Sequence, residues 1–132
     1  MRTTLLALTV AFLAATGSVR AADSPETVMI TLQAKPGSEQ ALADVLARHY
    51  ETARRMNLLV EGAAHMTLRA EAGGKPCFIE ILTWRDASIP DNAPPQILAI
   101  WKAMNALVEP RGGRPGLEIV EVTVVDTKAR LP

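Results

Sequence analysis

Residues 77–86 read CFIEILTWRD, and this alternating stretch decides the fold. In a β-strand successive side chains point to opposite faces. One face carries large apolar residues and a carboxylate, namely Phe78, Glu80, Leu82 and Trp84. The opposite face is also mainly apolar and carries Cys77, Ile79, Ile81 and Thr83. Because both faces are mainly apolar, something must cover the carboxylate, so Glu80 is the first candidate for a functional site.

The first 21 residues have the pattern of a secretory signal peptide. Arg2 precedes an apolar run from Leu5 to Ala15, and small residues lead up to Ala21. The run is about half of the roughly 20 residues that span a bilayer. We therefore expect a signal peptide over residues 1–21 and a single domain over 22–132. The mature protein is expected in the periplasm or secreted, without membrane contact after cleavage.

Composition argues against nucleic-acid binding, an internal disulfide and a metal site at the cysteine. Basic and acidic residues number 14 each, without a dense basic run, so a nucleic-acid-binding protein is not expected. Cys77 is the only cysteine, so no internal disulfide can form. It has no second cysteine or well-spaced histidine beside it, and we expect a buried, inert thiol and no metal site.

Periodicity along the chain predicts four strands and two helices. The expected strands cover 28–33, 64–70, 77–84 and 117–125, and the expected helices cover 38–56 and 97–108. This order predicts an α+β, ferredoxin-like βαββαβ fold, with a four-stranded antiparallel sheet and both helices on one face.

The glycine-rich loop between the second and third strands fixes their register. Pairing centred between Gly73 and Gly74 places Thr67 opposite Glu80 and Arg69 opposite Phe78. We expect the aliphatic face to contact the helices, and this face carries Met66, Leu68, Ile79 and Ile81. The open face would then carry Met29, Phe78, Leu82, Trp84 and Ile119, and a second copy of the chain would cover it in a homodimer.

The chain resembles a known family in three features. These are the Lys35-Pro36-Gly37 turn into an amphipathic helix, the strand with Glu-x-x-x-Trp ending at Trp84, and the order of elements. All three are similar to the antibiotic biosynthesis monooxygenase family of dimeric α+β barrels. The resemblance implies a homodimer with a pocket in each subunit, and an oxygenase that acts on an aromatic or quinone-type small molecule without metal or flavin.

Haem-degrading relatives share that fold but use residues that this chain lacks. They place an asparagine on the first strand and a histidine near the start of the second helix. The first strand here has no asparagine, and the histidine position falls on or near Pro94 and Pro95. We therefore expect no haem and no other cofactor.

Glu80 and His65 are the candidate catalytic residues. A carboxylate in an apolar position can act as a general base, and an imidazole on the same face suits proton shuttling. Candidate substrate-binding residues on that face are Trp84, Arg69, Thr67 and Phe78. The alternative is that Glu80 pairs with Arg69 or Thr67, or across the dimer, and only stabilises the sheet. His49 is expected to be a core-edge histidine with its hydrogen bonds satisfied.

Two functions therefore stay open. The first is an exported, cofactor-independent monooxygenase, and the second is a non-catalytic small-ligand-binding or stress-related barrel dimer. If the loop from Ser88 to Pro95 closed an apolar cavity of ligand size over Glu80, the first function would be favoured, whereas a filled interior would favour the second.

Overall fold

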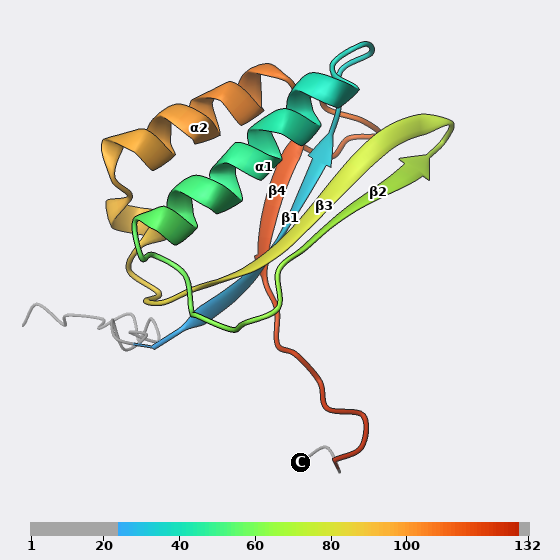
Figure 1. Cartoon of the computed structure of the whole chain (residues 1–132). Helices are drawn as coiled ribbons and strands as arrows, with labels where there is room; N and C mark the ends of the chain where they lie inside the picture. Colours follow the sequence, from blue (N-terminus) through green and yellow to red (C-terminus); the bar gives the residue numbers. More distant parts are fainter. Residues whose placement is uncertain (1–23, 130–132) are drawn as a thin grey trace, which may run out of the picture.

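The computed structural model describes residues 24–129, so the expected signal peptide lies outside the described residues. The elements are β1 (Glu26–Gln33), α1 (Glu39–Arg55), β2 (Met66–Ala72), β3 (Lys75–Trp84), the short 3₁₀ helix η1 (Pro90–Asn92), α2 (Pro95–Ala106) and β4 (Leu117–Glu121). The strands form one antiparallel sheet in the order β2-β3-β1-β4. Both helices lie on the same face of this sheet (Figure 1). The predicted ferredoxin-like α+β fold is confirmed.

The hairpin between β2 and β3 has the register that its glycines predicted. Gly73 and Gly74 have φ values of 61° and 75°, in the left-handed region that a tight hairpin turn requires. Thr67 lies opposite Glu80 and Arg69 opposite Phe78, as expected. β2 begins two residues later than predicted and extends to the turn.

α1 begins and ends within one residue of its predicted bounds, whereas α2 lies two residues earlier than predicted at both ends and β4 ends four residues before its predicted end. α1 follows Ser38, although the Ser38 side chain makes no capping hydrogen bond, and its last turn carries Arg54 and Arg55 at the negative end of the helix dipole. α2 begins with Pro95, whose fixed φ suits a first helical position. Neither helix is long and apolar enough to cross a membrane, nor is any other among residues 24–129.

The predicted assignment of the two sheet faces is wrong. The helices cover the face with Phe78, Glu80, Leu82 and Trp84, all of which are buried within one chain. The aliphatic face is the open one, where Met66 and Leu68 are 45% and 44% exposed. Ile119 pairs with Ile30 and therefore does not share the face of Met29, which pairs with Val120.

The side chains of the helices explain why they cover the face opposite to the predicted one. α1 contributes the buried side chains Leu42, Leu46 and His49, and α2 contributes Ile97, Ile100 and Met104. Large aromatic side chains of β3 fill the space beneath them, and His49 gives the carboxylate of Glu80 a hydrogen-bond partner. A buried carboxylate needs such a hydrogen-bond partner, and a layer of purely aliphatic side chains could not supply one.

Candidate functional site

Glu80 lies at the centre of a hydrogen-bonded network between the sheet and α1. Its side chain is fully buried, and Oε1 lies 2.6 Å from Nδ1 of His49, which is also fully buried. Oε2 lies 3.3 Å from Nε2 of His65, whose side chain is 21% exposed. The carboxylate therefore connects a histidine of the core with a histidine near the surface.

The inner end of this network lies beneath both helices. Nε1 of Trp101, on α2, donates a hydrogen bond to Nε2 of His49 at 3.0 Å. Trp84, at the end of β3, lies edge-on to the rings of both His49 and Trp101, with centroid separations of 5.8 and 6.2 Å. One helix, one strand and the second helix thus converge on a single buried imidazole.

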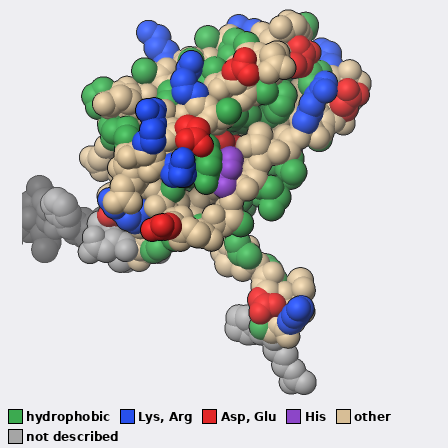
Figure 2. Space-filling view, in the orientation of Figure 1, with side chains coloured by type: hydrophobic (Ala, Val, Ile, Leu, Met, Phe, Trp, Pro, Cys, Tyr) green, Lys and Arg blue, Asp and Glu red, His purple; other side chains and the backbone are tan. Residues whose placement is uncertain are grey.

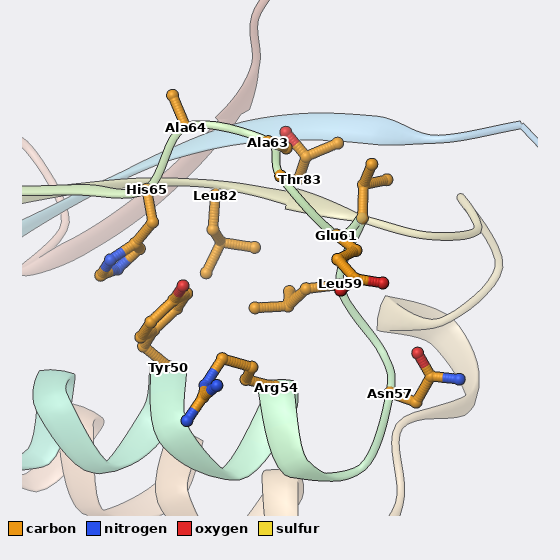
Figure 3. Close-up of a pocket in the computed structure, with 12 residues that line it drawn as sticks. Tyr50, Arg54, Asn57, Leu59, Glu61, Ala63, Ala64, His65, Leu82 and Thr83 are labelled. Carbon is orange, nitrogen blue, oxygen red and sulfur yellow. The ribbon is translucent and has the colours of Figure 1, made fainter.

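The outer end of the network opens into a cavity. His65 lies directly before β2 and forms part of the wall of a cavity of about 440 Å³. This volume is within the range of small-molecule sites. The cavity lies between α1, the segment that joins α1 to β2, and the last part of β3 (Figure 3).

Tyr50 and Arg54 bring α1 to this cavity. The rings of Tyr50 and His65 are stacked, with centroids 3.6 Å apart and an angle of 7° between their planes. Figure 3 shows the tyrosine ring extending from α1 toward His65, with Arg54 one turn farther along the helix. Arg54 also pairs with Glu51 at 3.2 Å on the exposed side of the helix.

The cavity wall mixes polar and apolar groups. Leu59 and Leu82 are apolar members, and Thr83, Asn57 and Glu61 add polar side chains. Histidine surface is visible on this face of the molecule (Figure 2), and it belongs to His65 because His49 is fully buried. The site can therefore bind a small molecule by apolar contact and hydrogen bonds, with an imidazole in reach.

The structure brings the two candidate catalytic residues together but places the other candidates elsewhere. Phe78 and Trp84 are buried in the core. Thr67 is exposed, and Arg69 is exposed and lies 3.9 Å from Glu71. None of these four lines the cavity. The expected pairing of Glu80 with Arg69 or Thr67 is wrong, because two histidines occupy both of its oxygens.

Sequence reasoning missed three contributors to this site. His49 was expected to be satisfied but not to bind Glu80, and Tyr50 and Trp101 were not candidates at all. Tyr50 adjoins His49 on α1, and Trp101 belongs to the apolar stripe of α2, so each reads as an ordinary helix residue in the sequence. Whether these three residues meet at one site depends on how both helices pack on the sheet.

The loop from Ser88 to Pro95 does not close this cavity. Its residues include the 3₁₀ helix η1, and none of them lines the cavity wall. Within residues 24–129 no cluster of histidine, cysteine, aspartate and glutamate could hold a metal ion. Cys77 is buried, as predicted.

Comparison with known proteins gives matches among solved structures. No protein-family model matches the chain, and no curated protein is significantly similar to it. SnoaB, a cofactor-independent oxygenase from Streptomyces nogalater, superposes with a TM-score of 0.58 at 19% identity, covering 81% of this chain and 99% of SnoaB. An antibiotic biosynthesis monooxygenase superposes with a TM-score of 0.56 at 17% identity, covering 76% of this chain and 98% of the other.

A third structure supports the same conclusion. PA3566 from Pseudomonas aeruginosa has a TM-score of 0.57 at 17% identity, and the match covers 81% of this chain and all of the other. At these identities the matches establish the fold. The chain therefore has the fold of the antibiotic biosynthesis monooxygenase proteins, as the resemblance in its sequence predicted.

Proposed function

We propose that the protein is a cofactor-independent monooxygenase that removes a proton from an aromatic or quinone-type small molecule bound beside His65. The observation that carries this proposal is the hydrogen bond between His65, in the cavity wall, and the buried carboxylate of Glu80. The shared fold with SnoaB, a cofactor-independent oxygenase, supports the type of reaction. The size of the cavity suits a small substrate.

His65 is the base in this proposal, and Glu80 positions it. When Nε2 of His65 donates its proton to Glu80, the lone pair of a neutral imidazole is on Nδ1. No group among residues 24–129 makes a hydrogen bond to that Nδ1. In this proposal Nδ1 accepts the proton from a ligand in the cavity, while Tyr50 holds the ring by stacking.

The substrate itself supplies the electrons for the oxygen chemistry. Loss of a proton from an acidic methylene of an anthrone-type ring leaves a carbanion, which can transfer an electron to dioxygen. Recombination and protonation give a hydroperoxide, and loss of water from it leaves a carbonyl group. One oxygen atom ends in the product and the other in water, so no external reductant is needed.

Oxygen uptake with a defined probe tests this function. The mature protein is incubated with 1,8-dihydroxyanthrone or a related anthrone, with an oxygen electrode and mass spectrometry as readouts. We expect oxygen uptake above the rate in buffer. The anthrone should give a product in which one oxygen atom replaces two hydrogen atoms. His65→Phe should lower the rate by about 10²–10⁴-fold, the usual contribution of a general base. Arg48→Ala, an exposed neighbour on α1, should not change it.

The second candidate is a non-catalytic ligand-binding protein. Glu80 is completely buried and does not line the cavity, and this observation favours a role in stability alone. In that case the same probes should raise the melting temperature without any oxygen uptake. Wild-type uptake that His65→Phe abolishes would exclude this candidate.

We also propose that the open face of the sheet binds a second copy of the chain. A row of apolar side chains crosses all four strands, through Met66, Ile81, Met29 and Val120, which pair in that order. Met66 and Val120 are 45% and 46% exposed. An apolar surface that is continuous across a whole sheet is unusual in a monomer.

Sedimentation tests this dimer. The mature protein should sediment with twice the mass of one chain at micromolar concentration, and Met66→Lys should shift it to the monomer. Val124→Lys serves as the control, because Val124 is also exposed but lies beyond β4. A wild-type monomer would contradict the proposal.

Export completes the proposed function. The pattern of residues 1–21 supports a periplasmic or secreted protein. Expression of the full chain in a bacterium, followed by fractionation and N-terminal sequencing, should give a periplasmic product that begins at Ala22. An uncleaved protein in the cytoplasm would contradict export but not the proposed chemistry.

A further inference from the structure

The hydrogen bonds around His49 determine which of its ring nitrogens carries the proton. The indole nitrogen of Trp101 can only donate a hydrogen bond, and it lies 3.0 Å from Nε2 of His49. Nε2 must therefore present a lone pair. A neutral imidazole with a lone pair on Nε2 carries its proton on Nδ1, which lies 2.6 Å from Oε1 of Glu80.

This tautomer has a consequence for Glu80. The proton on Nδ1 of His49 points at Oε1, so Oε1 accepts a hydrogen bond from the imidazole. With the opposite tautomer a lone pair of Nδ1 would face the carboxylate. Two lone pairs would then face each other in a fully buried position, and neither atom would have a hydrogen-bond donor there.

We propose that Trp101 is a positioning residue that locks the tautomer of His49 and thereby keeps Glu80 an acceptor for His65. The order of hydrogen-bond donation runs from Trp101 to His49 to Glu80, with His65 donating from the other side. The lock itself follows from the contacts of three residues that are remote from the cavity wall. Its effect on turnover rests on the proposed function.

The two tryptophans near His49 provide a matched comparison. Both rings contact the imidazole, with centroid separations of 5.8 Å for Trp84 and 6.4 Å for Trp101. Of the two, Trp101 is the one that donates a hydrogen bond to it. Replacing each by phenylalanine keeps an aromatic ring in both places and removes the donor in one of them.

Nitrogen NMR of the mature protein labelled with ¹⁵N-histidine tests the lock without any substrate. In the wild type we expect His49 to be protonated on Nδ1 and unprotonated on Nε2. Trp101→Phe removes the donor that keeps Nε2 unprotonated, so part of His49 should carry a proton on Nε2, whereas Trp84→Phe should keep the wild-type pattern. With an active substrate, Trp101→Phe should also lower kcat about tenfold, the equivalent of one hydrogen bond, with a smaller effect on KM.

A wild-type His49 that is protonated on Nε2, or on both nitrogens, would overturn the lock, as would an Nε2 that stays fully unprotonated in Trp101→Phe. The wild-type spectrum decides the first point even if the variant does not fold. A locked tautomer in a protein that turns over none of the probes would contradict the proposed function alone.

Discussion

The two faces of the β-sheet are both rich in apolar side chains but differ in what they can do. The inner face is covered by α1 and α2 and holds one carboxylate that is hydrogen-bonded to two histidines. The outer face has an uninterrupted apolar row across four strands and is open in a single chain. The comparison shows that the inner face holds a polar network because α1 and the segment before β2 supply its partners, whereas the outer face lies open and is the proposed dimer surface.

The largest difference is expected when the same charge is placed on each face. Leu82→Lys puts an ammonium group into a fully buried position of the inner face and should unfold the chain, because an unpaired buried charge costs several kcal/mol. Met66→Lys, on the outer face, should leave the chain folded. Circular dichroism during urea unfolding measures both. A folded, stable Leu82→Lys variant would contradict the observed assignment of the faces.

The two histidines sharpen the comparison within the inner face itself. His49→Phe leaves Glu80 and Trp101 each without a buried partner and should lower the free energy of unfolding by about 3 kcal/mol. His65→Phe keeps the ring that stacks on Tyr50 and loses one partly exposed hydrogen bond, which should cost about 1 kcal/mol. Urea unfolding of both variants tests this order. Equal losses would show that the network is not divided into a structural and a functional end.

The smallest effect is expected at Asp86, which lies two residues beyond the end of β3 and on neither face of the sheet. The backbone N–H of Ser88 donates a hydrogen bond to its carboxylate at 2.7 Å, and this bond lowers the pKa of Asp86. A lowered pKa in the folded state stabilises the protein above the unfolded value of about 3.9. That stabilisation is lost as the pH falls through the folded pKa. Melting temperatures between pH 5 and pH 2 should therefore fall less steeply for Asp86→Asn, and identical slopes would contradict this.

The sequence predicted which residues pair within the sheet, but it did not predict which face of the sheet the helices cover. Alternation and the Gly73-Gly74 turn placed Thr67 opposite Glu80, because register depends on the strand itself and on a local turn. Alternation also shows which residues share a face, but both faces of β3 are apolar, so it could not show which face the helices cover. That choice depends on where His49 meets both Glu80 and Trp101, which is a property of the packed chain.

The candidate site was predictable only in part for a related reason. Glu80 and His65 were found because a carboxylate and an imidazole stand out on an apolar strand face. The cavity was not predicted from the sequence. Much of its wall comes from residues 57–65, a connecting segment without strand or helix periodicity, and Tyr50 adds to it from the side of α1. Such segments are positioned by the elements that they join.

Hydrogen exchange at the substrate carbon tests most directly the central claim that Glu80 holds His65 as a base in the cavity. In D₂O without oxygen, the wild type should accelerate deuterium incorporation at the methylene of 1,8-dihydroxyanthrone above the buffer rate. Glu80→Gln retains an acceptor for His49 but turns an amide N–H₂ toward Nε2 of His65, so the imidazole proton moves to Nδ1 and the base is lost. The acceleration should fall about 10²–10⁴-fold in this variant. Exchange by Glu80→Gln at the wild-type rate, or no acceleration by the wild type, would contradict the account.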